Sequence, residues 1–471
     1  MKTESVNPNI SNFIKSLRDI GYSFEVAVAD VLDNSITANS KSVKIYTVDK
    51  PEMIFCMLDD GDGMSEAELK EAMRLANKDP EESRAKNDLG RFGLGLKTAS
   101  FSQCRNLTVI SKKQGRISAK QWDLDYLSKK NQWLLITPDD INKYPFIDDL
   151  KSQKHGTLVI WKQIDRVDKN GFVDTIDTLK KHLAMVFHRF MDGSILSQRL
   201  KIKLNNARIK PFNPFNPKHP ATQQIPTEKI IINNSTIEVQ PFILPHHSKV
   251  SQQEYEQYAT EDGYIKSQGF YLYRENRLLI YGTWWRIHKP SGAHQLIRVK
   301  IDISNDQDAM WGIDVKKSTA SPIPELRIEL KRIISKIKEK GSRIYKRRGS
   351  KIKEKGVVRF WETIPTDGTF RFAINRTHPI YTELCKNIND NCIEKLDFYL
   401  NGIEAYLPLE AIHAQLQNAP HSISQVEALD DNEIKAFANK IRTSHMPKEY
   451  IDRLLETELF KDKKELINAK K

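Results

Sequence analysis

The sequence predicts an α/β (α+β) protein in which an α/β sandwich is followed by a second α/β domain and a mainly helical C-terminal region. Helix-like and strand-like hydrophobic patterns are mixed over the first ~165 residues, as in a sandwich of sheet and helices. A second strand-rich segment follows, and the last ~115 residues show helical periodicity. Since a domain averages roughly 150 residues, we expect three domains, at residues 1–185, 186–345 and 346–471.

The composition excludes two broad classes of protein. Of the 471 residues, 39% are hydrophobic and 29% are charged, which is enough apolar material for packed cores and excludes a wholly disordered chain. No apolar run approaches the ~20 residues of a membrane span, and the N-terminus has no apolar signal region. The four cysteines form no CxxC pair and are interpreted as reduced thiols. We therefore expect a cytoplasmic protein without a membrane partner.

The positive charge is concentrated in one segment. The chain carries 74 Lys+Arg against 61 Asp+Glu, a net charge of +13. Residues 327–355 hold 13 Lys or Arg and 3 Asp or Glu, and so account for +10 of that charge. An excess of positive charge of this size in one segment indicates a function of that segment, such as contact with a polyanion.

The elements of the first domain follow from its hydrophobic periodicity. Residues 22–38 favour a helix, because Ser23 can cap it and four apolar side chains fall on one face. Ser65 and Glu68 form a capping box that starts the next helix, and residues 77–95 are polar and contain glycine, which indicates a loop or lid. Strands are expected at Lys44–Val48, Met53–Leu58, Leu107–Ser111, Ile117–Trp122, Trp133–Ile136 and Thr157–Trp161. The second of these is continuously apolar, as expected of a strand covered on both faces.

The second domain shows similar strand signals and ends in a long helix. A helix at about residues 173–190 leads into it. Pro322 and Pro324 open a helix whose apolar residues recur at helical spacing up to Ile337. The strands are expected at Leu200–Leu204, Lys229–Ile232, Ile237–Pro241, Phe270–Arg274, Arg277–Tyr281 and Leu296–Ile303.

The helix at residues 22–38 also carries a polar stripe. Asp30, Asp33, Asn34 and Thr37 lie at i, i+3, i+4 and i+7, and therefore share one face. A stripe of this kind is most often a solvated helix face, so taken alone it identifies no chemistry.

An apolar strand ends in Asp59 and a glycine turn, in the run LDDGDGM at residues 58–64. A carboxylate at a buried strand end can accept a hydrogen bond from an exocyclic amine, and the glycines let a ligand approach the backbone. The alternatives are a plain acidic turn or a calcium loop. An EF-hand loop needs glutamate at its twelfth position, where this chain has Lys70, which argues against calcium.

A glycine-rich run, GRFGLGLKT at residues 90–98, leads into a predicted helix. Free N–H groups at a helix N-terminus and the helix dipole both favour phosphate. The run nearly matches the P-loop pattern GxxxxGK[ST], but Leu96 separates Gly95 from Lys97, so we reject that motif. Each of the three features is weak alone, but their order within the first 100 residues is a strong signal.

Together the three motifs resemble those of the GHKL superfamily of ATPases, which includes gyrase B, MutL, the ninety-kilodalton heat-shock chaperones and histidine kinases. The family's ExxxN helix corresponds to residues 30–34, and its DxGxG turn corresponds to residues 59–63. The GxxGxG lid corresponds to residues 90–95, and the later threonine of the family corresponds to Thr157. The resemblance spans about residues 20–165. The phrases DNSITA, DDGDGM and GRFGLGLK look most like MORC-type and MutL-type ATPases.

The resemblance implies a role for each residue of the site. Asn34 would hold Mg²⁺ against the triphosphate of ATP, and Asp59 would accept the adenine amine, with Thr157 in support. Asp30 stands where the family has the glutamate that activates water. Its carboxylate is set back by about 1.5 Å, so we expect slow hydrolysis. The other residues implied to contact the nucleotide are Gly61, Gly63, Met64, Gly90, Gly93, Leu94, Gly95 and Lys97.

The second domain is similar to the transducer domain of dimeric GHKL ATPases, in which a basic residue on a loop reaches the γ-phosphate. A strand-like segment ends here at Lys316 and Lys317, of which we favour Lys317 for this role. The alternative is that both are solvated lysines. A positive charge supplied by a second domain would sense the γ-phosphate and so couple hydrolysis to domain movement.

The basic segment at residues 327–355 suits contact with the phosphate backbone of DNA. The alternatives are a solubilising surface helix or, less favoured, contact with an anionic membrane surface. The residues that we expect to contact DNA are Lys336, Lys338, Arg343, Lys346, Arg347 and Arg348.

These inferences predict an Mg²⁺- and ATP-dependent GHKL ATPase of MORC/MutL type that forms an ATP-induced homodimer and acts as a clamp or switch on DNA. Resemblance to bacterial MORC-like proteins implies a place in restriction or antiviral defence. The alternative is a chaperone-type ATPase that acts on protein clients and has no DNA affinity. The role of residues 356–471 stays open at this point.

Overall fold

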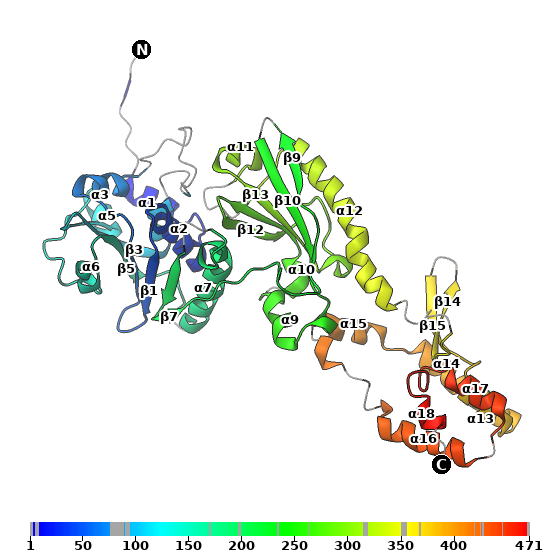
Figure 1. Cartoon of the computed structure of the whole chain (residues 1–471). Coiled ribbons are helices and arrows are strands. Elements are labelled where there is room, and N and C mark those ends of the chain that lie inside the picture. The colour runs from blue at the N-terminus through cyan, green and yellow to red at the C-terminus, as the bar shows by residue number, and fades with distance from the viewer. Residues whose placement is uncertain are drawn as a thin grey trace. The chain divides into compact units, whose positions relative to one another are not determined.

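The computed structural model describes the chain except for residues 1–2, 5–8, 76–88, 90–94, 169–170, 196–198, 233–234, 262, 314–318, 350–355, 367–368, 419, 424, 426–427, 445 and 469–471. The chain divides into two compact units. The first comprises residues 1–245, 258–291 and 295–337, and the second comprises residues 246–257, 292–294 and 338–471. The first unit contains two larger sheets, and the second contains a two-stranded hairpin and several helices (Figure 1).

The first sheet of the first unit has seven strands in the order β4-β3-β5-β2-β1-β6-β7. Neighbouring strands are antiparallel except β1 and β6, which run parallel. The strands are β1 (Ser42–Val48), β2 (Ile54–Asp59), β3 (Cys104–Lys113), β4 (Arg116–Asp123), β5 (Gly156–Ile164), β6 (Lys201–Leu204) and β7 (Ala207–Arg208).

Helices and loops cover both faces of this sheet, as an α/β sandwich requires. The larger core joins one face to side chains from seven helices. On the opposite face α6 packs Ile147 and Leu150 against Leu58 and Ile160. Strand β2 therefore lies between two apolar layers, which explains its continuously apolar sequence and confirms that prediction. The helices are α1 (Ile10–Arg18), α2 (Phe24–Thr37), α3 (Glu66–Met73), α4 (Gly95–Gln103), α5 (Leu124–Lys130), α6 (Ile147–Ser152), α7 (Phe172–Val186) and α8 (His188–Met191).

Helix α2 matches the predicted helix at residues 22–38 to within two residues at each end. Its polar stripe is not a solvated face throughout. Asp30 and Asp33 are each only 2% exposed, whereas Asn34 and Thr37 are exposed. Two carboxylates therefore face the interior of the first unit, where charged groups need partners. The predicted apolar stripe of the helix is buried: Val28, Val31, Leu32 and Ile36.

The second sheet of the first unit has the order β12-β11-β13-β10-β8, with β9 paired to β10. Helix α12 (Pro324–Gly349) packs on it, with Leu326, Leu330 and Ile337 in a common core with Val239 and Val299. This helix begins at the predicted proline and buries its predicted apolar face. The strands are β8 (Gln223–Gln224), β9 (Glu228–Ile232), β10 (Ser235–Ile243), β11 (Gly269–Arg274), β12 (Arg277–Thr283) and β13 (Ile297–Ile303). The short helix α10 (Gly263–Ser267) lies between β10 and β11, and α11 (Asp308–Trp311) lies between β13 and α12.

Two of the predicted strands differ from the structure. The strand expected at Leu200–Leu204 in the second domain is β6, which pairs with β1 and so extends the first sheet. Of the strand expected at residues 133–136, only Ile136 pairs, in an isolated bridge, because Trp133 packs onto the first core instead. We therefore propose that the first domain extends through β7 rather than ending at residue 185.

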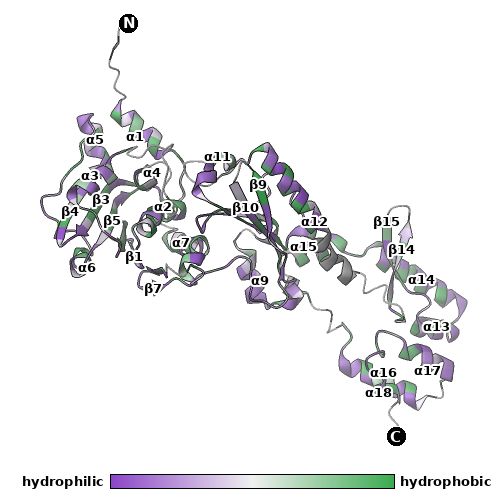
Figure 2. Cartoon of the chain, turned by 45° about the horizontal axis from the view of Figure 1, so that its top comes forward, coloured by the Kyte–Doolittle hydropathy of each residue, from purple (hydrophilic) through white to green (hydrophobic). Residues whose placement is uncertain are grey.

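The C-terminal region is mainly helical, as predicted, and also contains an unpredicted hairpin of β14 (Trp361–Thr366) and β15 (Thr369–Ile374). Helix α14 buries none of its residues fully, and Phe398 is 83% exposed. Figure 2 shows hydrophobic residues along this helix as well as along α12. The helices of this unit are α9 (Gln252–Ala259), α13 (Pro379–Lys386), α14 (Asp390–Ala405), α15 (Leu409–Asn418), α16 (Asp431–Thr443), α17 (Lys448–Leu455) and α18 (Glu465–Asn468).

Two predictions about the whole chain concern membranes and cysteines. Within the described residues, every helix is too short or too polar to cross a bilayer. All four cysteines are free thiols, and Cys56 and Cys104 are buried. The prediction of unpaired cysteines is therefore confirmed.

Candidate active site

Asp59, the last residue of β2, connects three of the predicted motifs. Its Oδ1 accepts hydrogen bonds from the backbone N–H of Gly61 at 3.0 Å and of Thr157 at 3.1 Å. Its Oδ2 accepts a hydrogen bond from the hydroxyl of Ser35, on α2, at 2.8 Å. The structure therefore gathers helix α2, the glycine turn and the start of β5 around one carboxylate.

The carboxylate of Asp59 retains capacity for one further donor. An ionised carboxylate offers about four acceptor positions, and the contacts with described residues use three of them. Burial raises the pKa of Asp59 to about 6, although the hydrogen bonds from Gly61, Ser35 and Thr157 oppose the shift. At neutral pH the group is thus still mostly ionised, and it suits a donor such as the exocyclic amine of adenine.

Ser111 of β3 ties the glycine turn to β5. Its hydroxyl lies 2.9 Å from the hydroxyl of Thr157 and donates to the carbonyl of Gly156 at 3.1 Å. It also accepts a hydrogen bond from the backbone N–H of Met64 at 2.8 Å. Neither Ser111 nor Ser35 was predicted as a site residue. Ser35 adjoins Asn34 in the motif and could have been found there, but nothing near Ser111 in the sequence signals its role.

The two glycines of the turn are required by close packing of the protein's own backbone. Gly63 has φ +67°, and a Cβ there would lie 2.0 Å from the carbonyl oxygen of Lys112. A Cβ on Gly61 would lie 2.8 Å from the carbonyl oxygen of Ala38. The absence of a side chain at both positions lets the turn pack against β3 and the end of α2. Approach of a ligand to these glycines, which the sequence suggested, stays a prediction.

Asn34 presents an amide on the exposed side of α2. Its Nδ2 donates to the carbonyls of Asp30 at 3.1 Å and Val31 at 3.2 Å, which fixes the orientation of the amide. An amide oxygen is a hard ligand of the type that Mg²⁺ prefers, and Mg²⁺ usually takes one or two protein groups together with phosphate oxygens and water. Among the described residues, no group of three or more His, Cys, Asp or Glu side chains could hold a metal. Asn34 therefore fits an ion that is held mainly by a nucleotide.

The predicted phosphate lid is described only at its end. Gly90, Gly93 and Leu94 lie outside the described residues, and α4 begins at Gly95. A Cβ on Gly95 would meet no described atom within 4 Å. Lys97 is buried, and its Nζ donates to the carbonyl of Ala72 at 2.9 Å. Contact of Lys97 with phosphate stays a prediction.

Asp30, the predicted catalytic carboxylate, has partners on both of its oxygens. The hydroxyl of Tyr22 donates to Oδ2 at 3.0 Å, and Arg277 of β12 donates to Oδ1 at 3.1 Å. Burial, and then the charge of Asp30, raises the pKa of Tyr22, so this hydroxyl stays a donor. The sequence predicted neither partner, because both contacts depend on tertiary structure.

The predicted basic residues are described in part. Lys316 and Lys317 lie outside the described residues. In α12, Lys336 forms an ion pair with Glu228 at 3.3 Å, and Lys338 is partly exposed. The side chains of Arg343, Lys346, Arg347 and Arg348 lie outside the described part of the chain, so their contact with DNA stays a prediction.

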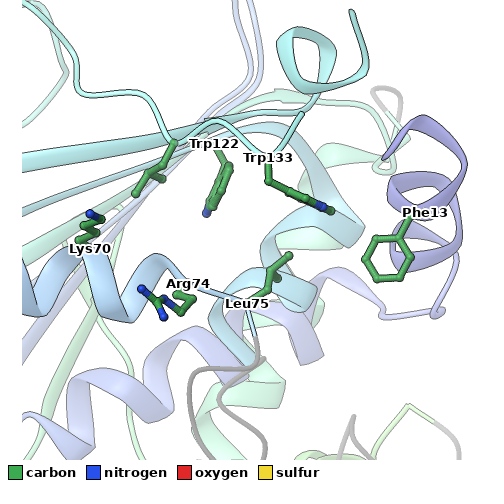
Figure 3. Close-up of a pocket in the computed structure, with 7 residues that line it drawn as sticks. Phe13, Lys70, Arg74, Leu75, Trp122 and Trp133 are labelled. Carbon is green, nitrogen blue, oxygen red and sulfur yellow. The ribbon is translucent and has the colours of Figure 1, made fainter. Parts of the chain in front are cut away.

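A separate cavity of about 510 Å³ lies on the first domain (Figure 3). Phe13, Trp122 and Trp133 provide aromatic walls, and Lys70 and Arg74 of the α3 region provide positive charge. The rings of Trp122 and Trp133 meet edge to face at 5.9 Å. None of these residues belongs to the predicted nucleotide site, so the cavity is distinct from the surroundings of Asp59.

A buried strand-end aspartate with one acceptor position left by the described residues, beside a helix that carries asparagine and a tight glycine turn, is the arrangement that the resemblance to GHKL ATPases predicts. Residues 22–157 match the family described as histidine kinase-, DNA gyrase B-, and HSP90-like ATPase. The chain is also 30% identical over 119 residues to ATPase morc-1 of Caenorhabditis elegans, an alignment that covers 25% of this chain and 14% of that relative. The N-terminal segment is thus similar to GHKL ATPase domains, and part of it is similar to a MORC ATPase, of which the chain spans about one seventh.

Proposed function

We propose that the chain binds Mg²⁺–ATP at Asp59 and hydrolyses it slowly. The observation that carries the proposal is the remaining acceptor position of Asp59, which lies beside the helix that bears Asp30 and Asn34. When bound, the metal would neutralise charge on the phosphates. The protein's part is to accept the adenine amine at Asp59, to hold the ion through Asn34, and to orient water at Asp30.

Asp30 is the proposed general base, and its burial has a consequence for the reaction. The carboxylate is 2% exposed and is bonded by Tyr22 and Arg277, so the proposal requires the attacking water to be carried to it by the bound nucleotide. Asp30→Asn keeps the size of the side chain and removes its basicity. We expect hydrolysis to fall by about 100-fold or more while binding of a non-hydrolysable ATP analogue stays within a few-fold. Unchanged turnover would show that Asp30 is not the base.

The second part of the proposal is an ATP-gated dimer that acts as a clamp or switch on DNA. ATP would close the lid and pair two N-terminal domains, and hydrolysis would release them. The charge distribution supports DNA as the partner, because residues 327–355 carry +10 of the net charge of +13. Lys316 and Lys317 precede this segment by about ten residues in the sequence, which suits a link between γ-phosphate sensing and DNA contact. A role in restriction or antiviral defence rests on the resemblance to bacterial MORC-like proteins alone.

A protein client is the second candidate, and one observation favours it. The C-terminal unit exposes large apolar side chains, including Phe398 at 83%, Tyr399 at 67% and Tyr406 at 88%. Exposed aromatic groups close together in the sequence often mark surfaces that bind proteins. In this case the ATPase would act on a protein, as chaperone-type members of the superfamily do, and DNA would have no effect on turnover.

The experiment that separates the two candidates is ATP turnover with and without DNA over a series of salt concentrations. A clamp on DNA predicts stimulation that fades as salt rises, and a protein-directed ATPase predicts no response. A variant with Lys346, Arg347 and Arg348 changed to alanine should lower the salt dependence of DNA affinity by a slope of about 3. The matched control changes the exposed lysines Lys129, Lys130 and Lys143, which removes the same charge outside the basic segment.

A further inference from the structure

Arg277 joins the second sheet to the helix that carries the proposed catalytic carboxylate. It is the first residue of β12, in the strand-rich part of the first unit. Its Nη2 lies 3.1 Å from Oδ1 of Asp30, and its Nε lies 2.7 Å from Oδ1 of Asp33. The three side chains are at most 5% exposed, so this is a buried ion cluster.

One edge of the guanidinium, formed by Nε and Nη2, faces both carboxylates: Nη2 donates a hydrogen bond to Asp30, and Nε forms an ion pair with Asp33. Asp30 and Asp33 are one helical turn apart on α2, so their carboxylates project from the same face. An arginine presents its donors in a rigid planar fork, which contacts two acceptors at once and fixes their relative positions. The ring of Phe187 lies 5.7 Å from the guanidinium and packs against it. Arg277 is therefore held in place by its surroundings, and it in turn holds Asp30.

We propose that Arg277 is a positioning residue for hydrolysis, which orients Asp30 from the second sheet. The proposal rests on the proposed function, in which Asp30 activates water. Aspartate is one methylene shorter than the glutamate implied by the family resemblance, so the position of its carboxylate matters more to the reaction. Tyr22 bonds one oxygen at 3.0 Å and Arg277 bonds the other, and together they fix the carboxylate plane. A displacement of ~1 Å of a catalytic group can lower turnover by about 100-fold.

This contact differs from the predicted γ-phosphate contact of Lys316 or Lys317. Those lysines would act on the nucleotide, whereas Arg277 acts on the carboxylate of the first domain. Arg277 is the first residue of β12, and the strand before it ends at Arg274, which is bonded to Asp308 at the start of α11. A movement of this sheet would therefore change the position of Asp30. The second sheet thereby controls the reaction through the protein's own ion pair.

The test uses the full chain and the variant Arg277→Lys, which keeps the positive charge but cannot reproduce the hydrogen bond to Asp30 together with the ion pair to Asp33. We expect kcat to fall by about 100-fold, with the KM for ATP and the Kd of a non-hydrolysable analogue within threefold of the wild type. The matched control is Arg298→Lys, because Arg298 is also buried in this sheet and bonds the carbonyls of Pro214 and Tyr258 rather than Asp30. Arg298→Lys should lower the melting temperature and leave kcat within threefold.

A second variant guards against a failure of the first to fold. Asp33→Asn combined with Arg277→Met removes one anion together with the cation, so the net charge of the cluster is unchanged. The same loss of kcat is expected, and Asp33→Asn alone should retain most of the activity because Arg277 still holds Asp30. Unchanged or increased kcat in the variants that lack Arg277, or an equal loss in Arg298→Lys, would overturn the positioning role.

The controls separate this inference from the proposed function. If the wild type hydrolyses no ATP, or if Asp30→Asn is fully active, the proposed function fails and Arg277 has no reaction to support. If the wild type is active and Asp30→Asn is inactive, while Arg277→Lys retains full kcat, the proposed function stands and the positioning role is wrong.

Discussion

Asp59→Asn should weaken ATP binding and at the same time stabilise the folded protein at neutral pH. Burial raises the pKa of Asp59 from 3.8 to about 6. A pKa difference of about 2, at 1.36 kcal/mol for a pKa difference of one, corresponds to roughly 3 kcal/mol in the free energy of unfolding. Because the pKa is raised on folding, Asp59 favours the folded state while it is protonated, below about pH 4. This contribution to stability is lost as the pH rises to about 6, where the buried carboxyl becomes charged. Asparagine carries no charge at any of these pH values, so the variant does not lose this stability.

The effect on binding follows from the hydrogen bonds around the side chain. The amide oxygen of asparagine can still accept from the backbone N–H of Gly61 and Thr157, which now donate to Asp59 at 3.0 and 3.1 Å. Its NH₂ group would then replace the Oδ2 atom of Asp59, so a hydrogen-bond donor would face the adenine amine, which is also a donor. The loss of a charge-assisted hydrogen bond and the unmatched donor cost about 3 kcal/mol, or roughly 100-fold in Kd.

The assay combines titration calorimetry with a non-hydrolysable ATP analogue and thermal unfolding at pH 4.5 and pH 7.5. We expect a Kd about 100-fold higher and a melting temperature that exceeds the wild type at pH 7.5 by more than at pH 4.5. The control is Asp62→Asn, because Asp62 is exposed in the same turn and its carboxylate accepts a hydrogen bond from the Asn39 side chain at 2.8 Å. Wild-type affinity in Asp59→Asn, or a loss of stability confined to pH 7.5, would refute the reasoning.

Three further predictions concern the same site. Gly63→Ala should lower the free energy of unfolding by at least about 2 kcal/mol in denaturant titration, because its Cβ would lie 2.0 Å from the carbonyl oxygen of Lys112; a wild-type midpoint would contradict this. Ser35→Ala should raise the Kd for ATP by about 3- to 10-fold, a smaller increase than that of Asp59→Asn, because it removes one donor to Asp59 at 2.8 Å. Calorimetry that shows an equal or larger increase in Kd for Ser35→Ala would contradict this prediction. ATP affinity should fall as the pH drops through about 6, because Asp59 becomes protonated. Purine riboside triphosphate lacks the exocyclic amine, so its affinity should change only with the titration of its phosphates. Identical pH profiles for the two nucleotides would argue against Asp59 as the adenine acceptor.

Elements that depend on neighbouring residues were predictable from the sequence. The capping box of Ser65 and Glu68 is present as predicted, because it needs only residues three apart. Helix α2 and the apolar strand β2 that ends at Asp59 were predicted within two residues, because their periodicity matches what they bury. The family resemblance then identified the nucleotide-binding domain, since its motifs are short and their order is specific.

Features that depend on distant parts of the chain were not predictable. Arg277 is 247 residues from Asp30 in the sequence, and nothing around either residue indicates their contact. The polar stripe on α2 was most simply a solvated face, and only the tertiary structure shows that Asp33 is buried beside that arginine. Likewise, β6 has the pattern of an ordinary strand, and the sheet that it joins is decided by a parallel pairing with β1.

The pairing of β1 with β6 decides where the chain can be cut for experiments on the isolated domain. A fragment that stops at residue 157, where the family match ends, would lose all but the first two residues of β5, which pairs with both β2 and β3, and would also lose β6, which pairs with β1. Strands β1, β2 and β3 would each be left with an unpaired edge of free N–H and C=O groups. Such edges pair with other chains, so this fragment is expected to aggregate or to form dimers unrelated to ATP. A fragment that runs through residue 208 ends the sheet on the two-residue strand β7, which is too short to template pairing. Dimerisation measured on the shorter fragment would therefore reflect pairing through its exposed strand edges. The effect of nucleotide on dimerisation has to be measured on the longer fragment.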